Sequence, residues 1–124
     1  MEGLGERLTR AQVLTLPYIS YRQGGAASYA DIELDRAGLS RRATLTVESF
    51  VLVPGLLRGT NMIAMVQRRL LTALDVTRLQ TARPPLRLAP LRERVYGHGR
   101  STGDPAHAWR RERLIDVAHS LVRR

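Results

Sequence analysis

Residues 44–70, TLTVESFVLVPGLLRGTNMIAMVQRRL, decide the expected fold of this chain. The stretch at 42–47 alternates and is rich in β-branched residues, which predicts a strand. Ser49 suits the N-cap of a helix that Gly59 ends. Residues 62–66 form a short apolar run, typical of a strand buried on both faces. Strand, helix and strand in succession predict a parallel crossover, the unit of an open α/β sheet.

The helix inside this stretch contains a proline, which is tolerated in the first turn because the nitrogen there needs no hydrogen-bond partner. Its apolar residues fall on roughly one helical face. The expected inward side chains are Val51, Leu52, Leu56 and Leu57.

The residues before this stretch fit the same architecture. Residues 9–14 predict a short helix capped by Thr9, and residues 18–21 predict a short strand. A small-residue loop at 23–27 leads to Ser28, which suits the N-cap of a helix ending at Gly38. In that helix Ile32 and Leu34 are expected to face inward. The charged residues expected to be mostly solvated are Asp31, Glu33, Asp35 and Arg36.

The residues after the stretch continue the alternation of helices and strands. Residues 68–74 predict a helix, and residues 76–80 predict a strand. Three prolines in residues 82–90 exclude regular helix there. Residues 91–96 can form a strand, and the final helix begins at Asp104-Pro105 and runs to about Val122. Its expected inward face comprises Leu114, Val117, Ala118 and Leu121.

Composition narrows the class of protein. The 124 residues, of which 44% are hydrophobic, provide one small domain and no apolar run near the ~18 residues that span a bilayer. We therefore expect no membrane partner. The N-terminal MEGLGERLTR lacks the apolar core of a signal peptide, and the chain has no cysteine, so a cytoplasmic location is expected.

The chain is strongly basic, with a net charge of +9, which invites a nucleic-acid interpretation. All 20 basic residues are arginine, and they are scattered along the chain. Aromatic residues make up only 5%, too few for base-stacking platforms. A small nucleic-acid-binding protein therefore stays an alternative.

One candidate ligand site is the loop before the helix at Ser28. Free backbone N–H groups and the positive end of a helix dipole at such a junction suit an anion. The same pattern also fits an ordinary glycine turn with a serine cap. The candidate residues are Gly24, Gly25, Ala26, Ala27 and Ser28.

A second candidate is the pair Ser49 and Phe50, directly after the strand at 42–47. Ligands of open α/β sheets bind beyond the carboxyl ends of the strands. The alternative is a serine cap and a core phenylalanine. Both candidates, together with the chain just after Val66, are expected to converge on one sheet edge.

No catalytic, metal or cofactor site is expected. Ser101, Asp104 and His107 superficially look like a hydrolytic triad, but capping explains their spacing and no nucleophile elbow surrounds the serine. The histidines, His98, His107 and His119, have no metal-ligand spacing.

Four strings resemble the C-terminal part of the effector-binding domain of LysR-type bacterial transcriptional regulators. They are LTRAQVLTLPYISYR at 8–22, DRAGLSRRATLTVESFVLVPGLLRGTNMIAMV at 35–66, RRL at 68–70 and DPAHAW at 104–109. The resemblance implies one lobe of a type 2 periplasmic-binding-protein-like domain, with a small-molecule effector in a cleft between lobes. Residues 9–82 would form the second lobe, and residues 83–124 a return connector, a strand and the final helix. Both candidate segments would face the cleft.

The resemblance also implies a truncated regulator, because the family's DNA-binding winged helix-turn-helix and first lobe are not in this sequence. DNA would then be contacted only through that missing head. The expected partners are the effector and a second copy or a full-length relative. A stand-alone interaction fragment is a further alternative. Departures from the family pattern fit either a fragment whose first-lobe partner is gone or a drifting remnant of a longer gene. They are Gln67, Gly97, Arg110 and Arg113.

Overall fold

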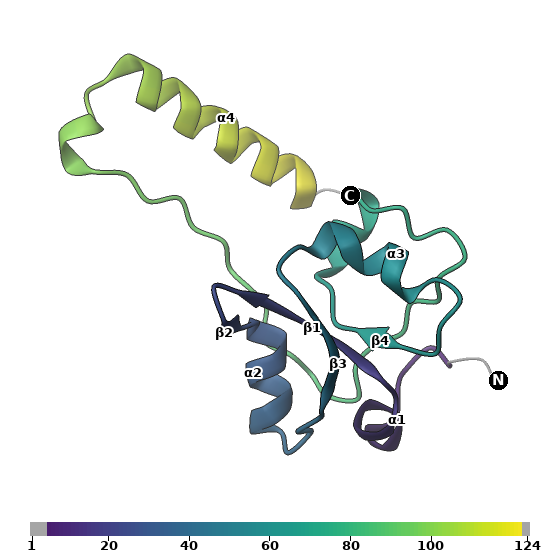
Figure 1. The fold of residues 1–124 in the computed structure, drawn as a ribbon. Coiled ribbons are helices and arrows are strands. Elements are labelled where there is room, and N and C mark those ends of the chain that lie inside the picture. The colour runs from purple at the N-terminus through teal and green to yellow at the C-terminus, as the bar shows by residue number, and fades with distance from the viewer. Residues whose placement is uncertain (1–4, 123–124) are drawn as a thin grey trace. The chain divides into compact units, whose positions relative to one another are not determined.

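The computed structural model describes residues 5–122 and contains a four-stranded mixed sheet (Figure 1). Its central strand, β1 (Tyr18–Gln23), lies between β3 (Ala43–Val47) and β4 (Ile63–Ala64). Both neighbours run parallel to β1, with Tyr21 opposite Val47 and Tyr18 opposite Ile63. The predicted parallel alignment of the three strands is confirmed, and the chain has an α/β architecture.

A short antiparallel hairpin, which the sequence did not predict, extends β1. The expected loop contains β2 (Ala26–Ala27), which pairs with the end of β1. Gly24 and Gly25 form the two-residue turn with φ of 55° and 83°. Positive φ at both central positions is the requirement of a tight hairpin turn, and glycine meets it without steric cost.

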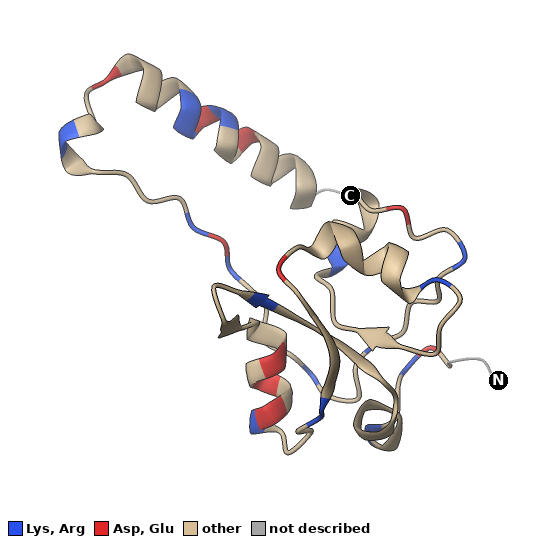
Figure 2. Cartoon of the chain, in the orientation of Figure 1, with Lys and Arg blue, Asp and Glu red and all other residues tan. Residues whose placement is uncertain are grey.

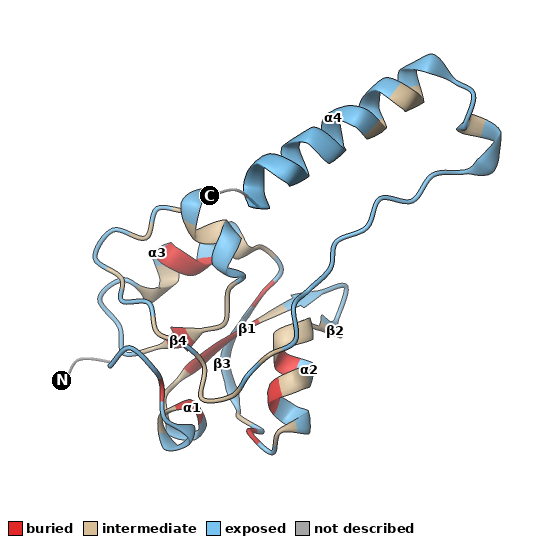
Figure 3. Cartoon of the chain, turned by 180° about the vertical axis from the view of Figure 1, so that it is seen from behind, coloured by how far each residue is buried: buried red, intermediate tan, exposed pale blue. Residues whose placement is uncertain are grey.

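Helices cover both faces of the sheet. Side chains alternate along β1, so Tyr18 and Ile19 point to opposite faces. On one face, Tyr18 packs in a cluster with residues of α1 (Arg10–Thr15) and α2 (Tyr29–Arg36). On the other, Ile19 packs with Val47 and the helical segment that follows β3. Figure 3 shows the buried residues gathered in the sheet and these neighbouring helices.

The caps of the first two helices form as predicted. The Thr9 hydroxyl accepts a hydrogen bond from the backbone N–H of Gln12. The side-chain oxygen of Gln12 accepts one from the backbone N–H of Thr9, which completes a capping box. α2 ends in a Schellman motif: Leu39 N donates to Leu34 O and Gly38 N to Asp35 O. Gly38 has a φ of 74°, which explains the glycine there.

The inward face of α2 differs from the prediction. Asp31 is buried, whereas Ile32 is 39% exposed. Leu34 is fully buried as expected. Asp31 and Leu34 are one turn apart, so the buried stripe is centred between them, and polar partners on the sheet compensate the aspartate.

The helix after β3 is split, which corrects its predicted inward face. It comprises a 3₁₀ turn, η1 (Phe50–Leu52), and α3 (Val53–Leu57). Val51 and Leu52 are 73% and 55% exposed, whereas Val53 and Pro54 are buried. A 3₁₀ turn has about 3.0 residues per turn, so a face drawn with 3.6-residue spacing is wrong across this junction.

The expected regular elements between residues 68 and 96 are largely wrong. The predicted helix is a 3₁₀ segment, η2 (Arg68–Thr72). Residues 76–80 form turns, and residues 91–96 form no regular structure. A strand needs a hydrogen-bonding neighbour. Within residues 5–122 no strand pairs with either segment. Between the two segments, Arg83 forms an isolated parallel bridge with Arg7.

The chain divides into two compact units, Met1–Pro90 and Leu91–Arg124. The second contains η3 (Gly99–Ser101) and α4 (Pro105–Val122). As predicted, Asp104 caps α4, and its carboxylate accepts hydrogen bonds from the N–H groups of Ala106 at 2.8 Å and His107 at 3.2 Å. The predicted inward face of α4 is exposed in the structure. No helix within residues 5–122 is long and apolar enough to cross a membrane.

Candidate functional site

The carboxyl ends of β1 and β3 lie side by side at one edge of the sheet. Tyr21 pairs with Val47 in register, and Ser49 follows two residues later. The ring of Phe50 stacks on that of Tyr21, with 3.8 Å between ring centroids and 22° between the planes. The stacked pair is half-buried and provides an apolar wall at this edge.

The hydroxyl of Ser49 is not used for helix capping. Its side chain makes no cap hydrogen bond, and only its carbonyl accepts one, from Leu52 N at 3.3 Å. Within residues 5–122 the hydroxyl has no hydrogen-bond partner. The capping interpretation of this side chain is therefore wrong, and the group is available to a ligand.

The glycine-containing candidate loop is mostly hairpin. Ala26 and Ala27 pair with Gln23 and Arg22 in the antiparallel ladder. The Arg22 guanidinium donates a 2.9 Å hydrogen bond to the carbonyl of Gly25, which fixes the tip of the hairpin. The loop therefore presents a rigid turn with a basic side chain folded over it.

Ser28 acts as an ordinary cap of α2, because its hydroxyl oxygen accepts a 3.1 Å hydrogen bond from the N–H of Asp31. Ser28 precedes a helix on one face of the sheet, and Ser49 precedes the helical segment on the other. Ser49 follows the carboxyl end of β3, whereas Ser28 follows β2, which runs antiparallel to β1. The convergence of the two segments on one edge stays a prediction. No hydrogen bond between residues of the described chain joins the two segments.

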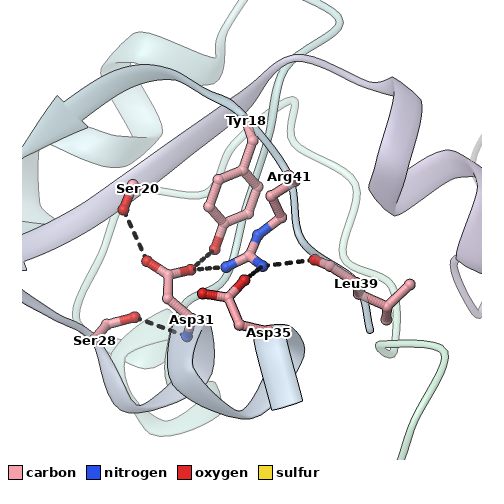
Figure 4. Close-up of polar contacts among 7 residues, drawn as sticks. All are labelled: Tyr18, Ser20, Ser28, Asp31, Asp35, Leu39 and Arg41. Carbon is pink, nitrogen blue, oxygen red and sulfur yellow. Dashed lines mark hydrogen bonds and ion pairs between the residues drawn. The ribbon is translucent and has the colours of Figure 1, made fainter. Parts of the chain in front are cut away.

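A buried polar cluster lies directly behind Ser28 (Figure 4). The carboxylate of Asp31 accepts hydrogen bonds from the hydroxyls of Tyr18 at 2.5 Å and Ser20 at 2.8 Å. It also forms an ion pair with Arg41, and the two side chains are only 6% and 4% exposed. This cluster ties α2 to the central strand and thereby fixes the position of Ser28.

Arg41 completes the cluster from the loop between α2 and β3. Its guanidinium donates to Asp35 at 3.0 Å and to the carbonyl of Leu39 at 2.9 Å, and it lies 4.4 Å from the centre of the Tyr18 ring. Its Nε has no partner within the described residues. Burial lowers the pKa of Arg41, but the interactions with Tyr18 and Asp31 outweigh it and raise that pKa overall.

Burial is also the largest influence on Tyr18. It raises the pKa of the phenol well above its ordinary value, and the hydrogen bond to Asp31 and the charge of that carboxylate add to the increase. Tyr18 is therefore a neutral hydrogen-bond donor at all physiological pH values.

Comparison with known proteins identifies the family. The chain is 31% identical over 121 residues to "Nodulation protein D 3" of Rhizobium leguminosarum bv. phaseoli, covering 95% of this chain and 40% of that protein. It is 33% identical over 121 residues to "Nodulation protein D 2" of Bradyrhizobium sp. (strain NC92), covering 95% and 36%. It is 29% identical over 85 residues to "HTH-type transcriptional activator NagR" of Ralstonia sp, covering 68% and 28%.

This chain is a homologue of LysR-type transcriptional regulators. The resemblance inferred from the four strings is thereby confirmed. No family model matches the sequence. The chain spans about two fifths of the length of the curated relatives it matches.

The buried residues behind the candidate loop were not predicted from the sequence. Asp31 was expected to be solvated, and Arg41 was not singled out. The sequence signal is weak because two further acidic residues, Glu33 and Asp35, follow Asp31 in the same helix, where acidic residues gather (Figure 2). Only the packing of α2 against β1 shows which carboxylate turns inward.

A cavity within Met1–Pro90 lies away from the predicted sheet edge. It has a volume of about 530 Å³ and lies between α3, β4 and residues 68–84. Of the expected third segment, which begins after Val66, Arg68 lines this cavity, together with the preceding Met65 and Val66. None of the predicted effector residues in the loop before α2 or after β3 does.

Proposed function

We propose that this chain is the effector-sensing part of a LysR-type regulator and binds a small anionic molecule at the carboxyl edge of its sheet. The family relationship supports a regulatory role. The observation that carries the proposed site is the unpartnered hydroxyl of Ser49 beside the Tyr21–Phe50 stack. In this proposal the sheet is one lobe of a periplasmic-binding-protein-like domain, and the edge faces the cleft between lobes.

The proposed site combines three kinds of contact. The Ser49 hydroxyl would donate a hydrogen bond to an anionic group, and the ring of Phe50 would offer an apolar wall. The hairpin tip at Gly24–Gly25 and the start of α2 at Ser28 would close the other side. Arg22, folded over the hairpin tip, adds a positive charge near the same edge.

The proposed mechanism is non-catalytic. An effector that binds one interlobe arrangement more tightly shifts the population toward it, and the shift is limited by the difference in affinity. DNA contact would belong to a helix-turn-helix outside these 124 residues. A second copy or a full-length relative would be the protein partner.

A titration with benzoate, which carries one anionic group on a flat apolar body, tests the site. We expect amide chemical shifts to move at Gly24–Ser28 and Ser49–Phe50, with affinity in the weak, millimolar class. Ser49→Ala should weaken binding several-fold with an unchanged fold. Ser40→Ala is the matched control, because Ser40 is exposed at the other end of β3. Shifts confined to other residues, or equal binding by both variants, would contradict the proposal.

The alternative of a stand-alone interaction fragment is favoured by one observation. The apolar side chains of α4 are uncovered, with Trp109, Val117 and Val122 57–63% exposed. Such a face favours self-association. Sedimentation velocity distinguishes the alternatives: a monomer that binds benzoate at the edge supports the sensing role, and a tight oligomer without binding supports the fragment.

A further inference from the structure

The cavity within Met1–Pro90 is enclosed by segments distant in sequence. We name it the α3 cavity, because α3 and β4 form one side and residues 68–84 the other. Its volume of about 530 Å³ lies within the ~300–1,000 Å³ range of small-molecule sites. None of the residues of the proposed edge site lines it.

Most of the wall is apolar and incompletely packed. Met62, Met65, Leu71, Leu74, Val76 and Leu79 line the cavity, and all are only half-buried. Protein interiors are normally close-packed, and side chains that face a void lose dispersion contacts. An apolar molecule would restore these contacts. The two methionines can adapt to its shape because their side chains are unbranched and flexible.

Polar contacts hold both ends of the outer wall, and Ala82 packs against the core cluster. Arg58, at the end of α3, forms an ion pair with Asp75 at 2.6 Å and donates to the Asp75 carbonyl at 2.8 Å. At the far end, Leu8 N donates to Arg83 O at 2.9 Å and Arg83 N to Glu6 O at 2.8 Å. These contacts fix both ends of the wall, one end to the C-terminus of α3 and the other to residues 6–8.

The charged groups of the cavity are predominantly basic. Arg68 and Arg83 line it, and both are exposed. Neither guanidinium has a carboxylate partner within residues 5–122. Glu6 is the acidic residue among the lining side chains. A carboxylate carried by a bound molecule would therefore find an unpaired guanidinium at the opening.

We propose that the α3 cavity binds a small hydrophobic molecule carrying one acidic group, with the apolar body between α3 and residues 68–84 and the acid at Arg68 or Arg83. This site is separate from the edge at Ser49. It does not depend on that site binding an effector.

The primary experiment uses the whole chain with decanoate and, as a neutral match, decanol. A methyl-resolved NMR titration should show saturable shifts of Leu71, Leu74 and Met65 with decanoate. Decanol should bind up to about 5-fold more weakly, since an ion pair with an exposed guanidinium contributes up to about 1 kcal/mol and about 1.4 kcal/mol is a tenfold change. Absence of shifts at the wall, or equal affinities for the two probes, would overturn the proposal.

Substitutions locate the site independently. Ala82 lines the cavity and is half-buried, so Ala82→Phe should occupy part of the space and weaken decanoate binding. Arg68→Gln with Arg83→Gln should remove the preference for decanoate over decanol. Ser40→Ala, at an exposed position outside both sites, should leave the decanoate affinity unchanged. A decanoate affinity in the folded Ala82→Phe chain equal to that of the wild type would refute the location. If this variant does not fold, the methyl shifts of the wild-type chain decide.

The two sites fail separately. Loss of benzoate shifts at the sheet edge would remove the proposed effector site and leave the α3 cavity intact. Loss of decanoate shifts at the cavity wall would remove the second site alone. A third titration with decanoate in the presence of saturating benzoate should give an unchanged affinity, and direct competition would contradict two separate sites.

Discussion

Replacing Asp31 by leucine tests whether the cluster behind Ser28 holds α2 on the sheet. The Arg41 side chain is 4% exposed, so the substitution leaves a buried guanidinium whose other carboxylate partner, Asp35, is 56% exposed. Removing one member of a buried ion pair costs about 3–5 kcal/mol. Because the contact with Asp35 remains, we expect a value near the lower limit, about 3 kcal/mol.

A second substitution separates the charge from the packing. Replacing both members of a buried pair by apolar residues is often neutral or stabilising. The double variant Asp31→Leu with Arg41→Met should therefore recover part of the loss, because the hydroxyls of Tyr18 and Ser20 still lack their acceptor. We expect a coupling energy of about 1 kcal/mol or more in a double-mutant cycle. Glu33→Gln on the same helix is the control, because its pair with Arg36 is partly solvated and should be worth below about 1 kcal/mol.

The assay is urea unfolding followed through the amide signals of β1, which report on Met1–Pro90 independently of α4. Equal slopes with shifted midpoints would show that stability and not compactness has changed. A loss below about 1 kcal/mol for Asp31→Leu, or a double variant as unstable as the single one, would refute the reasoning. Either result would mean that the cluster is solvated enough to tolerate an unpaired guanidinium.

The remaining predictions concern pH and backbone conformation. Since the pKa of Tyr18 is raised in the folded chain, the contribution of Tyr18 to stability is present below the ordinary tyrosine pKa of about 10 and is lost as pH rises through the pKa of the folded chain. Alkaline unfolding followed at 295 nm should therefore occur at higher pH for Tyr18→Phe, after correction for the stability difference of the two chains at neutral pH. The N–H groups of His107 and Ala106 lower the pKa of Asp104, so the stabilisation of α4 by Asp104 is present above the ordinary aspartate pKa and is lost as pH falls through the pKa of the folded chain. Circular dichroism should show less helix below about pH 4, and Asp104→Ala should reduce this pH dependence. Gly38→Ala should destabilise the folded chain by about 1 kcal/mol because φ at Gly38 is 74°, whereas Gly55→Ala in α3 should be neutral or stabilising because an added Cβ meets no atom within 4 Å. Equal urea midpoints for these two variants would refute the reasoning.

The sequence determined the elements whose signals are local. Helix ends are marked by Thr9, Gly38 and Asp104 through hydrogen bonds among neighbouring residues, and all three helix caps form in the structure. The three parallel strands were also predictable, because β-branched and apolar runs separated by helix-length segments allow few other topologies. The same local signals predicted the candidate ligand residues, whose convergence on one edge stays a prediction.

Only the tertiary structure decided which side chains are buried and which wall encloses a cavity. Asp31 turns inward because Tyr18, Ser20 and Arg41, up to 13 residues away, supply its hydrogen bonds. The segment at 91–96 has strand-like composition, but a strand forms only with a hydrogen-bonding neighbour. Arg58 holds residues 75–77 through contacts 17–19 residues apart, and no local pattern encodes that distance. Long-range pairing of this kind depends on the fold, and it set both the shape of the α3 cavity and the position of Ser28.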